Sequence, residues 1–269
     1  MKWMKKILFM VLVFAALSGT VNVQAAYHKD LTGDFKTHSA KADLNKDGKK
    51  EKITAKYSEK TYDYDLYINN KRLIKKTDGI WLVDTNTRDK YIEIISYNEN
   101  YNRKLKIYRY NGKKLTLYAY ANVDSYLTNL KKKHVYDYLG IDTIRSSGKG
   151  NITIYNTMYI PSVSDLWGST GGRCQIGLNY KVKKNSIQYD QNSTSTVKMD
   201  EEMLMATKTW QAYKYPKTKS NKKAFKIKKG EYIEITAMKI TPIYTYIKMN
   251  KVNMKQSGWV VFLTQDVEK

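Results

Sequence analysis

The sequence predicts an all-β protein. β-Branched and aromatic residues, including 24 tyrosines, recur in short runs that Asn, Asp, Gly and Lys separate, which is the pattern of strands joined by turns. Helix-type periodicity is sparse and is confined to two segments, 125–139 and 200–210. Because a polar, strand-poor stretch covers residues 189–202, we expect two modules, an N-terminal β domain over residues 26–197 and a small β-barrel over residues 198–269.

The predicted strands follow one another along both modules. Each is a run of β-branched or aromatic residues with turn-forming residues at its ends. They lie at residues 52–58, 64–70, 91–98, 103–110, 114–121, 151–158, 174–182, 224–230, 232–240, 244–250 and 258–263.

The first 25 residues have the three parts of a secretory signal peptide. Three lysines precede an apolar run from Ile7 to Leu17, and small side chains at Val23 and Ala25 mark a cleavage site. The apolar run is about half of the roughly 20 residues that a membrane-spanning helix needs, so a retained anchor is the weaker alternative. We therefore expect export, a mature chain that begins near Ala26, and no transmembrane segment in that chain.

The charge of the chain favours polyanionic partners. The net charge is +23, and loss of the signal peptide removes three lysines and no acidic residue, which lowers it to +20. Wall teichoic acids, phospholipid head groups, acidic glycans and extracellular nucleic acid attract such a charge without specific contacts. Only six of the 48 basic residues are arginines, which favours diffuse attraction over bidentate recognition. An AT-rich genome also encodes lysine-rich chains, and this alternative stays open.

The single cysteine, Cys174, excludes a disulfide within the chain. Export without disulfides is ordinary for proteins of Gram-positive bacteria and unusual for small secreted animal domains. The sequence has neither a cysteine placed for lipidation nor a wall-sorting tail. We therefore expect a secreted or cell-surface protein that is associated with the wall non-covalently.

The stretch "ADLNKDGKKEKI", residues 42–53, gathers oxygen-bearing side chains in a lysine-rich chain. A hard cation such as calcium takes six to eight oxygen ligands, which alternate residues of a tight loop can supply while a glycine allows the sharp turn. Counted from Asp43 as position 1, Gly48 stands at position 6 of this loop. Position 12 is Thr54, where a helix-flanked EF-hand has a bidentate glutamate. Candidate ligands fall at positions 1, 3, 5, 7 and 9: Asp43, Asn45, Asp47, the carbonyl group of Lys49, and Glu51.

Because a strand-like run follows the loop, it resembles the Asp-x-Asn-x-Asp-Gly-x-x-Glu hairpin loop of FG-GAP or integrin-type propeller repeats, which are similar to VCBS repeats. The resemblance implies a calcium ion held for structure. Its side-chain ligands would be Asp43, Asn45, Asp47 and Glu51, and its carbonyl ligand would be Lys49. Four lysines of this segment, Lys46, Lys49, Lys50 and Lys52, repel a divalent cation, so a metal-free Asx-rich turn remains the alternative.

Segments 43–53 and 84–94 form a weak internal repeat with an offset of 41 residues. Each begins Asp-x-Asn, ends in an isoleucine ten residues on, and leads into a strand. This period matches a four-stranded blade, so we expect the N-terminal domain to be propeller-like or a β-meander. The second copy lacks the glycine and inserts a residue before Asp89, and we expect no metal there.

The Asn111-Gly112 turn predicts a hairpin between strands 103–110 and 114–121. A strict two-residue loop pairs Ile107 with Thr116 and mixes the faces, whereas one extra residue pairs Ile107 with Leu117. We therefore expect a longer loop or a bulge. The apolar face would then hold Leu105, Ile107, Leu115, Leu117 and Ala119, and the other face Tyr108, Tyr110, Tyr118 and Tyr120.

From Ala206 onward the chain resembles the bacterial SH3-like domain in the order and spacing of its motifs. These are a Pro-x-Thr-x-Ser loop (216–220), a strand ending in Lys-Lys-Gly (228–230), a long strand (232–240) and a Gly-Trp-hydrophobic strand (258–260). The resemblance implies a five-stranded barrel that binds wall peptides or glycans. Its groove residues would be Trp210, Tyr213, Tyr215 and Trp259, and packing of these aromatic rings inside the barrel is the alternative.

These features together predict a secreted, non-enzymatic, cell-envelope binding protein with a structural calcium loop. Its expected partners are peptidoglycan or anionic wall polymers. The alternative is a cell-wall hydrolase or other envelope enzyme with catalytic residues in 120–180, where Cys174 and His134 are available as a nucleophile and a base. An extracellular nucleic-acid binder is a third class, which export disfavours. No residue set in the sequence identifies a substrate.

Overall fold

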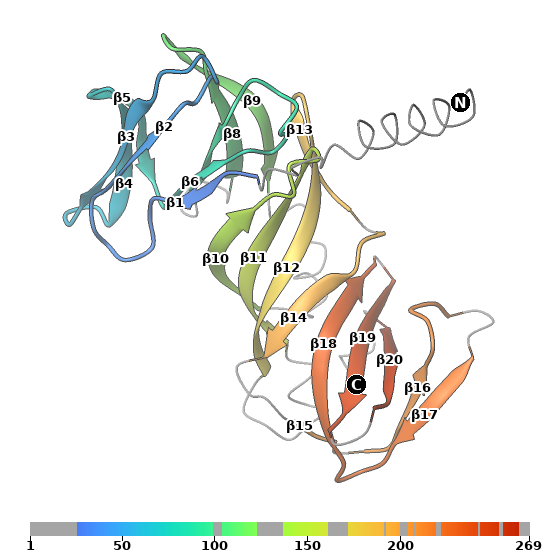
Figure 1. The fold of residues 1–269 in the computed structure, drawn as a ribbon. Helices are drawn as coiled ribbons and strands as arrows, with labels where there is room; N and C mark the ends of the chain where they lie inside the picture. Colours follow the sequence, from blue (N-terminus) through green and yellow to red (C-terminus); the bar gives the residue numbers. More distant parts are fainter. Residues whose placement is uncertain are drawn as a thin grey trace, which may run out of the picture.

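The structure is a computed structural model, shown as a ribbon in Figure 1. Every regular element in the described part of the chain is a strand and none is an α-helix, so the all-β prediction is confirmed. Within these residues no helix is long and apolar enough to cross a membrane. The described residues are 26–98, 104–122, 137–160, 172–190, 192–199, 204–206, 208–218, 222–241, 243–252 and 255–263.

The first sheet is an antiparallel meander of four strands in chain order. Burial alternates along its central strands: Ile53 and Ala55 point to one face, which is covered, and Lys52 and Lys56 point to the other, which is exposed. The sheet therefore has one apolar and one wet face, as antiparallel sheets often do. Its strands are β2 (His38–Ala42), β3 (Glu51–Ser58), β4 (Asp63–Ile68) and β5 (Lys71–Thr77).

The second sheet is packed on both faces. In its strand β6 all five residues are buried, and Ile80 belongs to the core shared with the first sheet while Trp81 belongs to the core on the opposite side. Burial on both sides accounts for the unbroken apolar run Gly-Ile-Trp-Leu-Val. The strand order is β1-β6-β7-β8-β9, with β1 (His28–Asp30), β6 (Gly79–Val83), β7 (Glu93–Asn98), β8 (Lys104–Tyr110) and β9 (Leu115–Asn122).

The third sheet begins as another meander and continues into the C-terminal part of the chain (Figure 1). Its first strands are β10 (Asp137–Arg145), β11 (Asn151–Ile160), β12 (Gly172–Lys183) and β13 (Ser186–Tyr189). β14 (Ser195–Met199) joins β12 to the C-terminal strands, and β15 (Leu204–Met205) pairs with β18. The order beyond β14 is β18 (Tyr232–Ile240), β19 (Tyr244–Lys251), β20 (Ser257–Leu263), β16 (Trp210–Tyr213) and β17 (Lys223–Ile227).

Three meanders, β2–β5, β6–β9 and β10–β13, thus follow one another along the chain, and the middle one has a core on each side. β2 and β6 begin 41 residues apart, at His38 and Gly79. The two copies of the internal repeat are therefore the loops that join the first strand of a meander to its second. The repeated sequence corresponds to a repeated structural unit.

β14 crosses the predicted domain boundary at residues 197/198. Along one edge of β14, Val197 pairs with Ile176 of β12. Along its other edge, Ser195 pairs with Met238 of β18. Hydrogen bonding is therefore continuous from β10 to the C-terminal strands, and the division into two domains stays a prediction. The sheets as described are open, with β10 and β17 at the two ends of the third sheet's order. Closed propeller and SH3-type barrel forms stay predictions.

Two local predictions are wrong. Within the segments expected to be helical, Asp137–Leu139 belongs to strand β10 and Leu204–Met205 to strand β15, and residues 125–136 and 200–203 lie outside the described residues. In the hairpin, the expected longer loop and a bulge are both present, at residues 111–114 and between Ile107 and Tyr108, but the predicted pairing is wrong: Ile107 pairs with Ala119 instead of Leu117. The bulge moves Leu117 to the face of Tyr108, where it is 47% exposed. Tyr110 is buried because the tyrosine face of this hairpin also packs on a core.

Candidate functional site

The predicted calcium loop is folded by its own carboxylates. The two carboxylate oxygens of Asp43 accept hydrogen bonds from the backbone N–H groups of Asp47 (2.9 Å) and Gly48 (2.7 Å). Gly48 has φ = 90°, a conformation that glycine adopts readily. Asp47 in turn accepts the N–H of Lys49 at 2.9 Å, and this bond is the main reason that the pKa of Asp47 lies below its ordinary value. The loop is an Asx-type turn as it stands.

The remaining predicted ligands lie in the same loop. Asn45 donates an amide N–H to Asp47 (2.9 Å), and its own amide oxygen is buried without a hydrogen-bond partner. Glu51 is buried and accepts the N–H of Leu44 at 2.9 Å. Among the described residues, no three His, Cys, Asp or Glu side chains are grouped closely enough to hold a metal ion. The loop is not a ready-made cation site, and calcium stays a prediction.

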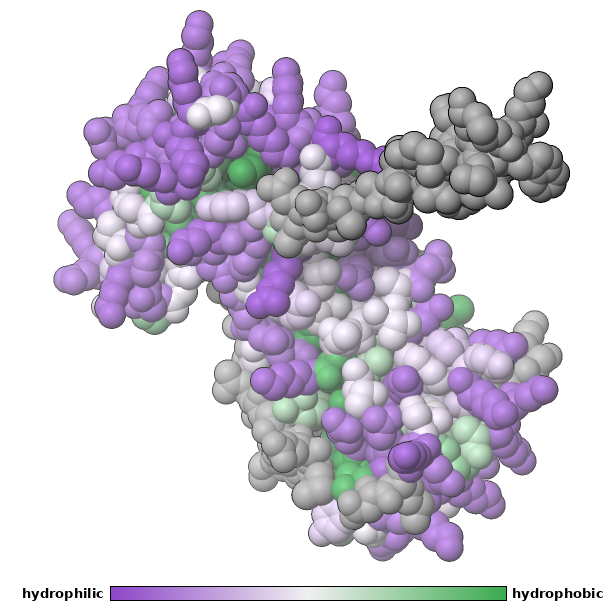
Figure 2. All heavy atoms as spheres, viewed as in Figure 1, coloured by the Kyte–Doolittle hydropathy of each residue, from purple (hydrophilic) through white to green (hydrophobic). Residues whose placement is uncertain are grey.

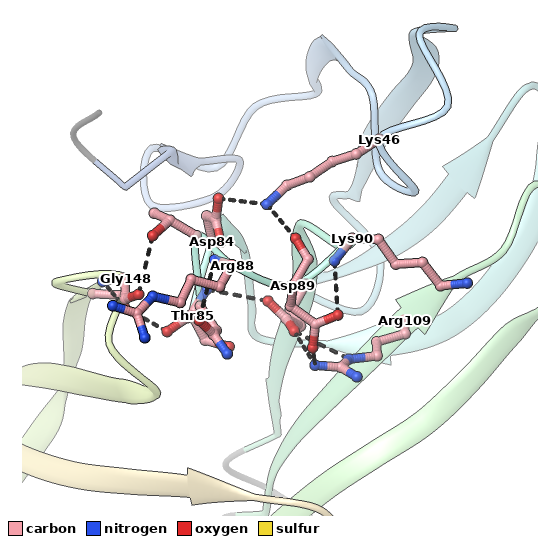
Figure 3. Close-up of polar contacts among 12 residues, drawn as sticks. Lys46, Asp84, Thr85, Arg88, Asp89, Lys90, Arg109 and Gly148 are labelled. Carbon is pink, nitrogen blue, oxygen red and sulfur yellow. Dashed lines mark hydrogen bonds and ion pairs between the residues drawn. The ribbon is translucent and has the colours of Figure 1, made fainter. Parts of the chain in front are cut away.

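The second copy of the repeat is occupied by cations of the protein itself (Figure 3). The ammonium group of Lys46, which extends from the first loop, lies 2.9 Å from the carboxylate of Asp84 and 2.8 Å from the carbonyl oxygen of Asp89. The guanidinium group of Arg109 binds the carboxylates of Asp89 (2.5 Å) and Glu93 (2.8 Å). Each carboxylate of this loop therefore faces a cation that another segment supplies.

Glu93 is a buried acidic residue of the middle sheet. Its side chain is fully buried, and burial raises the pKa of its carboxyl group, while the N–H of Thr85 (3.1 Å) and the guanidinium of Arg109 offset part of this shift. Arg109 is itself stacked, with its Cζ atom 3.5 Å from the ring centroid of Tyr118 and 4.9 Å from that of Tyr91. Glu93 takes the place in the second loop that Glu51 takes in the first.

A third loop, residues 146–150, lies against the second. The carbonyl oxygen of Gly148 accepts the N–H of Thr87 at 3.0 Å, and the N–H of Gly150 donates to Thr85 at 2.7 Å. Asn86 and Lys149 form an isolated β-bridge between the two loops. Figure 3 shows Gly148 beside Thr85, on the side of the second loop away from Lys46. The three loops thus hold the three meanders together, which is a structural role.

The predicted C-terminal groove residues are divided by the structure. Trp259 is buried with Ala237 in a small core, and Tyr213 stands opposite it across β16 and β20. Trp210 is half-buried against the main core. Tyr215 is exposed, with the ammonium of Lys217 5.3 Å from its ring centroid. Of these four rings, Tyr215 is the one most open to solvent in the described structure.

Of the two residues named for the enzyme alternative, the structure describes Cys174. Cys174 is fully buried in the main core, where a nucleophile could not meet a substrate. His134 lies outside the described residues, as do residues 123–136 and 161–171 as a whole.

A groove that no sequence signal marks lies on the exposed face of β3, β4 and β5. Its volume is about 390 Å³. Four basic and two acidic residues line it, together with Tyr67, which shares the face of Asp65, and Tyr57, whose ring lies on the opposite, apolar face; the surface over this sheet is largely hydrophilic (Figure 2). The residues come from three strands and one turn, so they form no motif in the sequence. They are Lys56, Tyr57, Ser58, Thr61, Asp63, Asp65, Tyr67, Arg72, Lys75 and Lys76.

Asp65 organises the cationic side of the groove. One of its carboxylate oxygens accepts the backbone N–H of Lys76 and the other accepts from the guanidinium of Arg72, both at 3.1 Å. Lys76 has φ = 51°, and the pairing of β4 with β5 is irregular, with shifts in register around Leu66. Such irregularities re-aim side chains on a strand. Asp65 therefore fixes the bulged strand and, with it, the cations at the groove.

Comparisons with protein-family models, with curated proteins and with solved structures find no match. The FG-GAP-type and SH3-like resemblances therefore stay predictions. What the groove can do follows from its own chemistry: cations at its wall favour an anionic ligand, and Tyr67 adds an apolar ring with a polar tip.

Proposed function

We propose that this protein is an exported, non-enzymatic binder of anionic cell-envelope polymers, and that the groove on β3–β5 holds the charged groups of the polymer. The observation that carries the proposal is the groove itself, in which four cations and Tyr67 lie around a hollow of about 390 Å³. Two carboxylates leave an excess of two positive charges there. The ligand therefore has to be an anion.

Lysine dominates the groove, and this favours phosphate over carboxylate. An ammonium group acts as a point charge on phosphate oxygens, whereas planar, two-pronged recognition of a carboxylate needs a guanidinium group. Arg72 offers such a group, but Asp65 already binds it. Lys56, Lys75 and Lys76 are exposed and can follow phosphates spaced along a flexible chain.

Lysines on an edge strand often serve a different purpose, because they prevent pairing with another sheet. That explanation suits Lys75 and Lys76, which lie on the edge strand β5. It does not suit Lys56, which lies on the inner strand β3 directly opposite Asp65. It also does not explain why the backbone of Lys76 is held in a left-handed conformation.

The finer architecture belongs to the same proposal. We propose that the three meanders are propeller-type blades and that β16–β20 form an SH3-like unit. Their strand counts, the 41-residue repeat and the Gly-Trp strand support this. In that unit the exposed ring of Tyr215 would contact wall peptide or glycan, with Trp210 and Tyr213 beside it, and Trp259 would support them from the core.

Calcium in the first loop is a further part of the proposal. The buried, unpartnered amide oxygen of Asn45 supports it. The ammonium group of Lys46 also supports it, because it points away from the first loop and binds Asp84 in the second. Extracellular calcium modules bind at roughly 10⁻⁴–10⁻³ M. Millimolar calcium should therefore raise the melting temperature (Tm) of the protein and leave that of Asp47→Ala unchanged. An equal Tm for the wild type with and without calcium would reduce the loop to a metal-free turn.

The binding proposal is tested by sedimenting the mature protein, residues 26–269, with purified cell walls at 0.15 M salt. The Lys56→Gln/Lys76→Asn double variant removes two groove charges, and Lys104→Gln/Lys113→Asn removes two exposed charges elsewhere. Asn suits the left-handed backbone at position 76. We expect about a tenfold loss of wall affinity for the groove variant and less than about a twofold loss for its charge-matched control. Equal losses would mean that attraction is diffuse and the groove has no part in it.

A further inference from the structure

The loop before β2 and the turn between β3 and β4 lie at the same end of the first sheet. β2 pairs with β3 in antiparallel fashion, so the residues just before β2 lie beside those at the end of β3. The hydroxyl oxygen of Thr37 accepts the backbone N–H of Tyr57 at 3.1 Å, which joins the two segments. Residues 33–37 and 58–62 are called the tip loops below.

Each tip loop exposes a large aromatic side chain in a backbone conformation that such residues avoid. Phe35 is 67% exposed with φ = 59°, and Tyr62 is 72% exposed with φ = 56°. For bulky residues a positive φ is a strained outlier. Other exposed rings of the described chain, such as those of Tyr120 and Tyr232, lie on strands without a positive φ. The strain at the tip loops is not offset by burial, because both rings face solvent.

The two exposed rings belong to one aromatic cluster. The ring of Phe35 meets that of Tyr57 edge-on, with 5.8 Å between centroids, and the ring of Tyr57 lies 5.2 Å from that of Tyr64. Burial raises the pKa of the Tyr57 hydroxyl, and the hydroxyls of Tyr62 and Tyr64 raise it further, which agrees with the closeness of Tyr62. The hydroxyl oxygen of Tyr64 accepts the N–H of Phe35 at 3.1 Å and so fixes its loop. The cluster therefore extends the apolar face of the sheet into solvent at its end.

The tip loops carry balanced charges, unlike the rest of the chain. Lys36 and Lys60 are exposed there, but so are Asp34 and Glu59, and His38 binds Asp34 at 2.5 Å. A polyanion selects a cationic surface, which the tip loops do not offer. The mature chain as a whole carries +20, because the net charge of +23 includes three lysines of the signal peptide. An apolar, nearly neutral tip thus stands on a strongly cationic body.

We propose that the tip loops insert Phe35 and Tyr62 into the interface of an anionic phospholipid bilayer. This inference goes beyond the binding of wall polymers and uses a different surface, since neither residue lines the groove. Aromatic rings at an exposed tip bury their apolar surface at the level of the lipid head groups, and a cationic body is attracted to an anionic leaflet. A second copy of the chain is the less suitable partner, because two such bodies repel each other.

The test measures partitioning of the mature protein onto vesicles by flotation at 0.15 M salt. Vesicles of phosphatidylglycerol and phosphatidylcholine are compared with vesicles of phosphatidylcholine alone. Phe35→Asn and Tyr62→Asn remove the rings and suit the left-handed backbone, and Tyr120→Asn removes an exposed ring elsewhere. We expect the wild type to favour the anionic vesicles, each tip variant to lose about fivefold to tenfold without a lower Tm, and Tyr120→Asn to lose less than about twofold.

A tryptophan at the tip reports insertion directly. On anionic vesicles, the emission of Phe35→Trp should gain a component at shorter wavelength that lipids brominated along their acyl chains quench, because the indole ring leaves water. Tyr120→Trp is the matched control and should show neither change. Emission of Phe35→Trp that stays the same on vesicles would overturn the inference.

The outcomes separate this inference from the proposed function. No binding of the wild type to anionic vesicles overturns the inference and leaves the groove proposal to its own test with cell walls. Equal partitioning of the wild type and both tip variants would mean attraction by charge alone, which also overturns it. If Phe35→Asn and Tyr62→Asn weaken wall binding as much as vesicle binding, the rings contact wall polymer and the bilayer is the wrong partner. A loss on vesicles with wall binding unchanged supports the inference.

Discussion

Arg109 determines whether a buried carboxylate can stay charged in the middle sheet. Glu93 is fully buried, and a carboxylate in that position is costly unless a cation and hydrogen-bond donors surround it. Arg109 binds it at 2.8 Å and also binds Asp89, so one guanidinium group neutralises part of two acidic residues. The two tyrosine rings beside Arg109 keep the guanidinium group in place.

Replacing Arg109 with Gln should therefore destabilise the fold in a pH-dependent way. Burial already raises the pKa of Glu93, and loss of the guanidinium group would raise it further. A carboxyl group with a raised folded-state pKa favours folding below its unfolded-state pKa, and this contribution is lost as the pH rises through the folded-state value. The free energy of unfolding should fall by about 2–4 kcal/mol at pH 7.5 and by less at pH 5, as measured by urea titration.

Arg88→Gln is the control for this prediction, because Arg88 is exposed in the same loop. Its effect should stay within about 0.5 kcal/mol at both pH values. If Arg109→Gln lowered the free energy of unfolding equally at pH 5 and pH 7.5, Arg109 would stabilise the fold through packing against the tyrosines and not through the charge of Glu93.

The sequence predicted the residues of the first loop better than their partners. Asp43, Asn45 and Asp47 lie in one turn around Gly48, because the spacing of Asx residues and glycine fixes a local turn. The partner of Lys46 was not predictable, since Asp84 lies 38 residues away and meets it only after two sheets have stacked.

At the scale of elements, the irregular edge strand β5 shapes the groove, and Asp65 is the side chain that holds it. Asp65→Asn retains an oxygen that accepts the N–H of Lys76, whereas Asp65→Ala removes that acceptor. Amide exchange at Lys76, followed by NMR, should therefore accelerate about tenfold in Asp65→Ala and much less in Asp65→Asn. Equal acceleration in both variants would instead assign the effect to the lost ion pair with Arg72.

The C-terminal strands depend on a close approach at Gly258. A Cβ atom added there would lie 2.9 Å from the Cβ of Ala212 and 3.1 Å from the ring of Phe225, closer than such atoms pack. Gly258→Ala should therefore push β20 away from β16 and cost about 1–3 kcal/mol of unfolding free energy. Denaturant titration beside Ser257→Ala, an exposed neighbour, checks this, and a cost below about 0.5 kcal/mol would contradict the packing of β16 on β20.

The strands could be predicted from the sequence, but the bulges could not. The Asn111-Gly112 turn correctly placed a hairpin between β8 and β9, because turn chemistry acts locally. The bulge after Ile107 has no signature of its own, and it moved Leu117 to solvent. The groove was missed for a related reason: Lys56, Asp65 and Lys76 share a face only because of register and a bulge between separate strands.

At the scale of the whole molecule, one core crosses the predicted domain boundary. The main apolar cluster contains Trp81 of the middle sheet, Ile154 of the third meander and Val260 of β20. β14 adds continuous hydrogen bonding along the same path. The all-β class and the repeat were predictable, because composition and period are properties of sequence. The continuity through β14 was not, because residues 189–202 look like a polar linker.

This continuity predicts a single cooperative unfolding transition for the mature chain. Residues on both sides of 197/198 lose the same core when either part opens, so neither part should unfold first. Differential scanning calorimetry should show one peak whose calorimetric and van't Hoff enthalpies agree. Two separated transitions would contradict the shared core and favour two independent modules.

The central claim is that the exposed face of β3–β5 is where the protein holds its polymer. Hydrogen–deuterium exchange of the mature protein, with and without poly(glycerol phosphate) at 0.15 M salt, tests it most directly. We predict slower exchange at the turn 59–62 and along β5, and no change in β16 and β20, where the C-terminal aromatic residues lie. Protection confined to β16 and β20, or spread evenly over the lysine-rich surface, would contradict the claim.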